Sequence, residues 1–225
     1  DTRLVDGVLA MAWDDSTIEL LKRMRDVAVV TLNRMDVPEF SAVATDHRRQ
    51  GEMAVEYLAG RGHKRIAMIC EERSNWGTQE RIEGFTGKLR ELELPVDEFS
   101  VSFTDHQPMY GLLRRLATMA QPTAIFVANE SLGLEASYIL QNVLNIRVPQ
   151  DVSLVGMESP QVSQFLSPPL TTIAQPLDEL AERSLEVLLR QIGNSHEPTR
   201  LMLENRLIER ESVSAPANEA RNRSS

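Results

Sequence analysis

The chain has 225 residues, of which 42% are hydrophobic and 25% are charged, a balance typical of a globular protein with one large domain or two small ones. Its 33 acidic and 24 basic residues give a formal net charge of −9, which argues against binding of a nucleic-acid backbone by this segment. No apolar run is long enough for a membrane helix, and a single cysteine, Cys70, excludes an internal disulfide and favours a reducing compartment. Because the chain starts at Asp1 without a methionine, we expect it to be a fragment of a longer protein.

Strand-like apolar runs alternate with helix patterns in the first half of the chain. The side chains of Asp14 and Asp15 suit the N-cap of a helix, and Gly62 suits a helix C-terminus. Asp46 stands at the end of a strand, directly before another helix. The predicted strands cover residues 5–13, 27–33, 41–45 and 66–70, and the predicted helices cover residues 14–25, 49–60 and 76–91.

The second half continues this alternation and ends in a polar tail. The predicted strands cover residues 99–103, 123–128, 152–156 and 170–175, and the predicted helices cover residues 109–119, 130–143 and 176–192. Residues 201–205 and 207–211 are the last segments expected to be ordered. The last helix carries an apolar stripe that only Ser184 interrupts, formed by Leu177, Leu180, Ala181, Leu188 and Ile192. The composition of residues 214–225 predicts disorder. The regular alternation predicts an α/β fold with parallel sheets.

Two polar residues directly follow predicted strands. Glu158 comes after the strand over residues 152–156, and Asn129 comes after the strand over residues 123–128. In open parallel sheets, the C-terminal ends of the strands face the ligand crevice. Their positions make both residues candidates for a binding site.

Five sequence motifs follow one another along the chain. They read GHKRIAMI at 62–69, RIEGF at 81–85, TAIFVANESLGLEA at 123–136, PPLTTIAQP at 168–176 and LIERES at 207–212. Together they resemble the effector-binding core of the LacI/GalR family of bacterial transcriptional regulators, and the resemblance covers residues 4–213.

The resemblance implies two Rossmann-like subdomains of the periplasmic-binding-protein-like type I fold, joined by three crossovers near residues 45, 174 and 205. The N-terminal subdomain would comprise residues 1–45 and 175–204, and it would be incomplete at its N-terminus. The C-terminal subdomain would comprise residues 46–174 and 205–213.

The resemblance also implies a function. The core would bind a sugar or nucleoside-like effector in the cleft between the subdomains, and would thereby control operator DNA binding by an N-terminal domain that this chain lacks. It would form a homodimer, with Leu134, Tyr138, Phe165 and Leu166 at the interface. We expect a cytoplasmic protein without membrane contact, and neither a cofactor nor an enzymatic activity.

Arg81 and Glu158 are the leading candidates for effector contacts. Arg81 lies in the RIEGF motif, and its rigid guanidinium suits paired hydrogen bonds to hydroxyl or carboxylate oxygens. Glu158 stands where the family has mostly aspartate, and it is either an acceptor for ligand hydroxyls or an exposed loop acid. We expect the two side chains to lie across one cleft and to share the effector.

The resemblance and the strand ends suggest further ligand-binding residues: Asn129, Gln175, Asn33, Asp46, His106, Trp76, Met11 and Trp13. Asn129 is equally suited to a helix cap, and so is Asp46. His106 aligns with a stacking aromatic residue, although a single histidine is more often structural. The indoles of Trp13 and Trp76 either cover the apolar face of a ligand or pack on the surface. Met11 suggests that the N-terminal subdomain gives the cleft a less polar wall.

Motifs for metal binding and catalysis are absent from the sequence. The four histidines and one cysteine have no zinc-ligand spacing, and there is no G-x-G-x-x-G, P-loop or G-x-S-x-G motif. Two alternatives to the regulator stay open at this point. One is a periplasmic sugar-binding protein of an ABC transporter, which shares the fold, and the other is an α/β enzyme.

Overall fold

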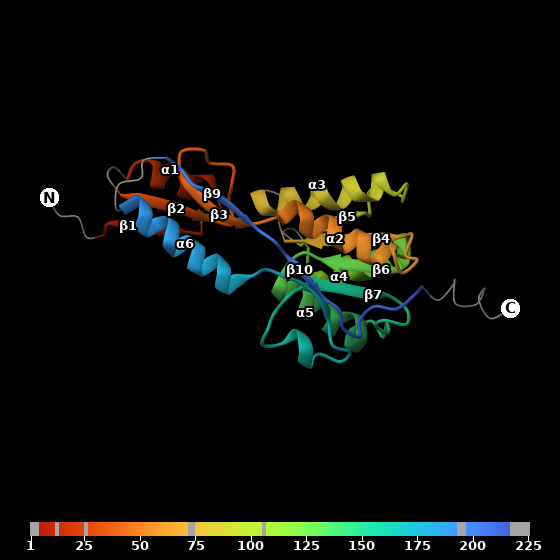
Figure 1. Cartoon of the computed structure of the whole chain (residues 1–225). Coiled ribbons are helices and arrows are strands. Elements are labelled where there is room, and N and C mark those ends of the chain that lie inside the picture. Colours follow the sequence, from red (N-terminus) through yellow and green to blue (C-terminus); the bar gives the residue numbers. More distant parts are fainter. Residues whose placement is uncertain are drawn as a thin grey trace. The chain divides into compact units, whose positions relative to one another are not determined.

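The computed structural model describes residues 5–11, 14–24, 27–71, 75–104, 107–192 and 197–216. They form two sheets with flanking helices (Figure 1), which confirms the predicted α/β fold class. The chain divides into two compact units. Unit 1 comprises residues 1–46, 74–77 and 175–205, and unit 2 comprises residues 47–73, 78–174 and 206–225.

Unit 1 contains a four-stranded parallel sheet of order β1-β2-β3-β9. The strands are β1 (Gly7–Ala10), β2 (Ala28–Leu32), β3 (Ser41–Thr45) and β9 (Arg200–Leu203). The helices are α1 (Asp15–Lys22) and α6 (Leu177–Ile192). As predicted, α1 begins with an Asp14 cap, because the Asp14 carboxylate accepts a hydrogen bond from the backbone N–H of Thr17 at 2.8 Å.

The buried face of α6 differs from the predicted stripe at both ends and at Ala181, which is exposed. Leu180, Ser184 and Leu188 are buried, and Val187 joins them, whereas Leu177 and Ile192 remain exposed. Ile192 lies over Gly7 of β1, which is the last strand of the described sheet, so no further strand covers it. Ser184 is compatible with the buried face because its hydroxyl donates a hydrogen bond to the carbonyl of Leu180 at 2.5 Å.

Unit 2 contains a six-stranded sheet of order β10-β8-β7-β6-β4-β5, parallel except for β10. The strands are β4 (Ile66–Cys70), β5 (Val101–Phe103), β6 (Ala124–Val127), β7 (Ser153–Met157), β8 (Thr171–Ala174) and β10 (Arg206–Ile208). The helices are α2 (His47–Ala59), α3 (Trp76–Glu91), α4 (Met109–Arg115) and α5 (Glu130–Tyr138). Short helical turns cover Leu116–Ala120, Ile139–Val143 and Ser163–Phe165.

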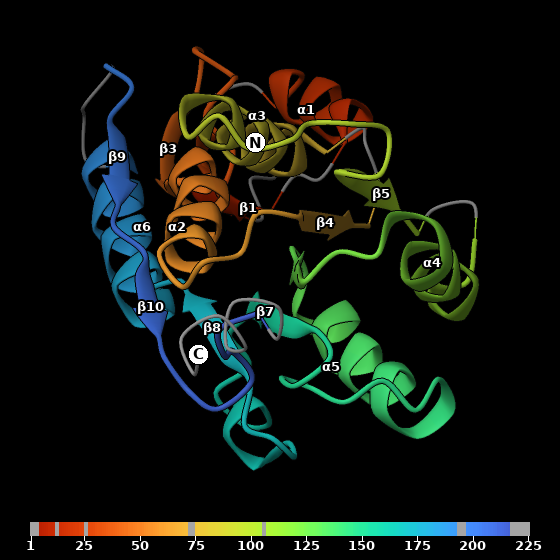
Figure 2. The same ribbon diagram turned by 90° about the vertical axis from the view of Figure 1, so that its right-hand side faces the viewer.

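Helices cover both faces of this sheet. Residues of α2 and α3 form one apolar cluster with the sheet, and residues of α4 and α5 form another on the opposite face (Figures 1 and 2). Every residue of β4, β6, β7 and β8 is buried, as expected for central parallel strands. In the part of the chain that is described, no helix is both long and apolar enough to cross a membrane.

Two glycines allow the backbones of α2 and α3 to approach closely. A Cβ atom on Gly51 would lie 2.1 Å from the carbonyl oxygen of Arg81, and a Cβ on Gly84 would lie 2.0 Å from that of Arg48. Only glycine, which has no Cβ atom, allows the two helices to approach this closely. The contact determines where Arg81, on α3, lies relative to the start of α2.

The C-terminal segment is held on unit 2 beyond β10. Ser212 exchanges hydrogen bonds with Leu154 of β7, and the backbone N–H of Ser214 donates to the hydroxyl of Ser153 at 3.1 Å. The imidazole of His63, which is buried, lies 2.8 Å from the carbonyl oxygen of Ser214. The predicted tail, residues 214–225, therefore includes at least one residue with defined contacts, and residues 217–225 lie outside the described part of the chain.

Candidate functional site

Polar residues follow several strands at the C-terminal edge of the unit 2 sheet. Glu71 follows β4, Thr104 follows β5, and Glu158 follows β7. Asn129 comes two residues after the end of β6. Because these strands are parallel, their C-terminal ends share one edge of the sheet, which is where ligands bind in open α/β folds.

Arg81 lies on α3 beside the start of α2. Its Nε donates a hydrogen bond to the side-chain oxygen of Gln50 at 2.6 Å, and one terminal nitrogen lies 3.2 Å from Nδ1 of His47. Desolvation by burial lowers the pKa of Arg81 to about 10, and the nearby Cys70 thiol opposes this shift. Of its five N–H donors, two have partners among the described residues, and none of these partners is a carboxylate. The Arg81 side chain is half-buried, and three of its N–H donors have no partner among the described residues.

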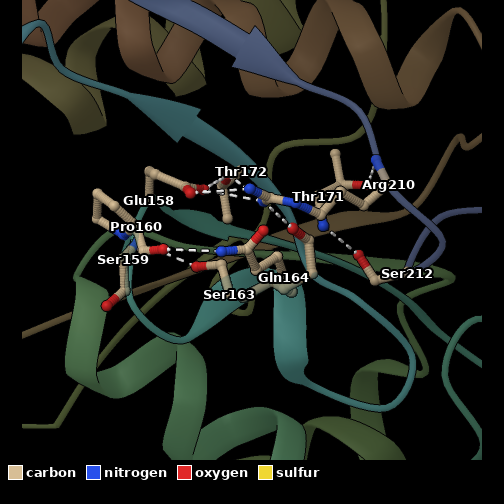
Figure 3. A network of polar contacts seen from close by, with 10 residues as sticks. Glu158, Ser159, Pro160, Ser163, Gln164, Thr171, Thr172, Arg210 and Ser212 are labelled. Atoms are coloured by element: carbon tan, nitrogen blue, oxygen red, sulfur yellow. Dashed lines mark hydrogen bonds and ion pairs between the residues drawn. The ribbon is translucent and has the colours of Figure 1, made fainter.

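Glu158 is bound within unit 2 by Arg210 (Figure 3). The guanidinium donates to both carboxylate oxygens, at 2.8 and 2.9 Å, and the hydroxyl of Thr172 donates to one of them. The ion pair is largely buried, with side-chain exposures of 16% for Arg210 and 9% for Glu158. Burial by itself raises the pKa of Glu158, but the hydrogen bonds from Arg210 and Thr172 outweigh burial and leave this pKa below its ordinary value.

Asn129 serves as the N-cap of α5. Its Oδ1 accepts hydrogen bonds from the backbone N–H of Leu132 at 3.1 Å and from the hydroxyl of Ser131 at 2.8 Å. Its Nδ2 donates to the carboxylate of Glu71 at 3.0 Å. The helix-capping alternative for Asn129 is therefore correct, and the same side chain also orients a carboxylate at the sheet edge.

In unit 1, Asn33 and Gln175 lie in hydrogen-bonding contact. The amide of Asn33 donates to the side-chain oxygen of Gln175 at 3.0 Å, and the hydroxyl of Thr45 lies within 3.2 Å of both side-chain oxygens. Asn33 adopts the left-handed conformation, with φ of 53°, which asparagine tolerates better than most residues. Two of the predicted residues thus belong to one polar cluster.

The remaining predicted ligand residues are dispersed. Asp46 is half-buried, and its backbone carbonyl accepts a hydrogen bond from Asn205 at 2.8 Å. Met11 is 54% exposed, and Trp76 is half-buried as the first residue of α3. Trp13 and His106 lie outside the described residues.

The structure gives Arg81 and Glu158 separate partners. Within the described ranges, no hydrogen bond or ion pair joins the two side chains, and both oxygens of Glu158 are already engaged. Gln50, Arg210 and Glu71 are not among the ligand-binding residues predicted from the sequence. Arg210 lies inside the LIERES motif and Glu71 directly follows a strand, so a sequence pattern could have identified both residues. No sequence pattern indicates Gln50, because its pairing with Arg81 depends on how α2 packs on α3.

The residues predicted for a dimer interface lie at the surface of unit 2. Tyr138 is 63% exposed on α5 and Phe165 is 76% exposed, whereas Leu134 and Leu166 are half-buried. The side chain of Gln141, in the helical turn Ile139–Val143 that follows α5, donates to the carbonyl of Ser167 at 2.9 Å, so this turn and the Phe165 segment are neighbours.

Among the described residues, no group of three His, Cys, Asp or Glu side chains could hold a metal ion. One shallow pocket, lined by Arg65, Ile66, Asp97 and Ser100 among others, lies at the opposite edge, beside the N-terminal end of β4. It includes none of the predicted site residues.

Comparisons with known proteins identify the family. Residues 55–213 match the periplasmic binding protein-like domain. The HTH-type transcriptional repressor PurR of Klebsiella pneumoniae (strain 342) is 31% identical over 220 residues, which cover 93% of this chain and 63% of that protein. The chain thus spans less than two thirds of the length of this relative.

Solved structures give the same result. A complex of the transcriptional regulator CelR with cellobiose is 30% identical, with a TM-score of 0.85 over 94% of this chain and 67% of that one. A LacI family transcriptional regulator from Enterococcus faecium with bound ribose is 28% identical, with a TM-score of 0.80 over 93% of this chain and 80% of that one. These relatives favour a regulator over the periplasmic sugar-binding alternative. The chain belongs to the periplasmic binding protein-like domain family, and it is similar to the core of LacI family transcriptional regulators.

Proposed function

We propose that this chain is the effector-binding and dimerisation core of a cytoplasmic transcriptional regulator. It binds a sugar or nucleoside-like molecule, and this binding controls operator DNA recognition by an N-terminal domain outside the chain. The net charge of −9 supports the assignment of DNA contacts to another part of the protein, because an acidic surface repels phosphates. No enzymatic step is assigned to the core.

The observation that carries this proposal is the environment of Arg81. The Arg81 guanidinium is half-buried, has no carboxylate partner among the described residues, and has three N–H donors without a partner there, so it is suited to a molecule that supplies acceptors. The hydroxyl or carbonyl oxygens of a sugar or a base would supply them. Gln50 and His47 hold the guanidinium in one orientation, so binding would cost little further ordering.

Ligand binding and regulation are coupled in this proposal through differential affinity. An effector shifts the equilibrium between DNA-competent and DNA-incompetent states only if it binds one of them more tightly. In the homodimer, this shift changes the arrangement of two DNA-binding domains. The dimer interface contains Leu134, Tyr138, Phe165 and Leu166. The exposure of Tyr138 and Phe165 supports this surface.

A thermal-shift screen tests ligand binding. We would measure the unfolding midpoint of the chain with D-ribose, cellobiose, inosine and adenine, because a ligand that binds only the folded state stabilises it by about 2.7 kcal/mol at a hundredfold excess over Kd. Arg81→Ala should weaken binding of the responding compound by about 1.5 to 3 kcal/mol. Arg90→Ala, at an exposed position of the same helix, is the matched control and should leave binding unchanged. A chain that responds to none of these compounds would contradict the proposal.

A further inference from the structure

Two glutamates follow strands at the C-terminal edge of the unit 2 sheet, and their carboxylates are in different states. Both oxygens of Glu158 accept hydrogen bonds from Arg210, and one also accepts from Thr172. Only one oxygen of Glu71 has a partner among the described residues, the Nδ2 of Asn129. Glu71 is exposed, whereas Glu158 is largely buried. A ligand hydroxyl would have to displace Arg210 to reach Glu158, but it can reach Glu71 directly.

The backbone around Glu71 is tied to both neighbouring strands. The N–H of Ala128 donates to the carbonyl of Ile69 at 2.9 Å, and the N–H of Thr104 donates to the carbonyl of Cys70 at 3.0 Å. Arg81 interacts electrostatically with Cys70, the residue before Glu71. The end of β4 is thus flanked by a rigid donor, Arg81, and an acceptor, Glu71.

Asn129 gives the Glu71 carboxylate a defined orientation. Because Oδ1 of Asn129 caps α5, its Nδ2 must face away from the helix, and there it meets Glu71 at 3.0 Å. An amide nitrogen carries two hydrogens, and one of them is used. Among the described residues, the pair therefore has one carboxylate oxygen and one amide hydrogen without a partner, which matches a hydroxyl group that both donates and accepts.

We propose that Glu71, oriented by Asn129, is the carboxylate that recognises effector hydroxyl groups, and that Glu158 is a positioning residue that anchors the C-terminal segment through Arg210. The ligand class is a neutral molecule with free hydroxyls, such as a sugar or a ribose moiety. This inference rests on the proposed function, because it names the group that reads the ligand of that same site.

Three glutamate-to-glutamine variants separate the two roles. Glu71→Gln removes the proposed acceptor charge, and Glu158→Gln disrupts the ion pair with Arg210. Glu130→Gln is the matched control, because Glu130 is also exposed and lies next to Asn129 in the first turn of α5. Calorimetric titration with D-ribose and with cellobiose gives the affinity of each variant, and urea unfolding gives its stability.

Glu71→Gln should weaken sugar binding about 10- to 100-fold, the effect of losing a hydrogen bond to a charged acceptor, and should leave the urea midpoint unchanged. Glu158→Gln should lower the urea midpoint and change affinity less than Glu71→Gln does, and Glu130→Gln should change neither. Substitution of 2-deoxy-D-ribose for D-ribose should weaken binding to the unaltered chain more than to Glu71→Gln, which a purely structural role for Glu71 would not produce.

Three results would overturn the inference, and each contradicts a different part of it. If Glu71→Gln binds sugar as tightly as the unaltered chain does, the assignment of Glu71 fails while the proposed function stands. If Glu71→Gln lowers the urea midpoint as much as Glu158→Gln does, Glu71 is structural. If neither sugar binds the unaltered chain, the sugar class of effector fails, and the role of Glu71 fails with it.

Discussion

Arg210 and Glu158 illustrate how a single pair of side chains changes the interpretation of a site. Arg210 also donates to the carbonyl of Leu170 at 2.6 Å and to the hydroxyl of Thr172 at 3.0 Å, so its guanidinium links the segment after β10 to β7 and β8 (Figure 3). A charged pair with this little exposure is expensive to break, because removal of one partner leaves the other desolvated and alone.

Arg210→Gln should therefore destabilise unit 2 by about 3 kcal/mol. The measurement is the urea midpoint, read together with an unchanged slope of unfolding free energy against urea concentration. Arg147→Gln is the control, since Arg147 forms a bidentate pair with Asp151 on the surface, where solvent screens the charges and the urea midpoint should hardly change. Equal effects of the two variants would show that the Arg210 pair is no stronger than a surface pair.

The same ion pair predicts a dependence of stability on pH. Because the pKa of Glu158 is lower in the folded chain, its contribution is fully present above the unfolded-state pKa of about 4.3 and is lost as the pH falls through the folded-state pKa. The difference in unfolding free energy between the unaltered chain and Glu158→Gln should shrink as the pH falls from about 6 to about 3. Urea titrations across this range measure it, and a difference that stays constant with pH would refute the linkage.

Cys70 should be inert in the folded chain. Its side chain is buried within β4, and burial raises the pKa of the thiol to about 12, although the charge of Arg81 opposes the shift. Thiol reagents need the thiolate, so the reaction with Ellman's reagent at neutral pH should be very slow in buffer and fast in urea. Labelling in buffer at the rate of the unfolded chain would show that the thiol is accessible.

At the scale of elements, the contact between α2 and α3 determines the geometry around Arg81. The helices approach so closely at Gly51 and Gly84 that any side chain there would meet the backbone of the other helix. The partners of Arg81, Gln50 and His47, lie in the first turn of α2, and Gln50 directly precedes Gly51. A change at either glycine would therefore separate Arg81 from the groups that orient it.

Gly51→Ala and Gly84→Ala should each destabilise the chain by about 1 to 3 kcal/mol, because the added methyl group forces the helices apart. Gly87→Ala is the matched control on α3, where a Cβ would meet nothing within 4 Å, and it should stabilise by about 0.5 to 1 kcal/mol through higher helix propensity. Urea unfolding tests all three. A stabilising effect at Gly51 or Gly84 would mean that the two helices have room to separate.

At the scale of the whole molecule, the proposed dimer rests on exposed aromatic residues of unit 2. Tyr138 and Phe165 expose most of their surface, and aromatic residues of this kind contribute strongly to protein interfaces. The hydrogen bond from Gln141 to Ser167 holds the two segments that carry them next to each other.

The double variant Tyr138→Ser and Phe165→Ser should shift the chain from dimer to monomer, which sedimentation velocity at micromolar concentration would detect. Met119→Ser is the control, because Met119 is 64% exposed but lies outside the proposed interface. If the unaltered chain sediments as a monomer, the interface assignment is refuted. If the double variant remains a dimer, another surface mediates the association.

The α/β alternation and the family follow from the sequence by itself. Strands Ser41–Thr45 and Ile66–Cys70 and helix Trp76–Glu91 have the predicted bounds, because apolar runs and helical periodicity depend only on neighbouring residues. The motifs identify the family because each is contiguous and their order along the chain is preserved.

Only the tertiary structure decided which side chains meet. Arg210 reaches Glu158 across 52 residues of sequence, and Gln50 reaches Arg81 across 31. Strand order in the sheet determines the first contact, and the close packing of α2 on α3 determines the second. A local pattern identifies a residue as a strand-end carboxylate, but its charge is available to a ligand only if the fold does not pair it with a cation. Glu158 is paired with Arg210, whereas the partner of Glu71 among the described residues is the neutral amide of Asn129.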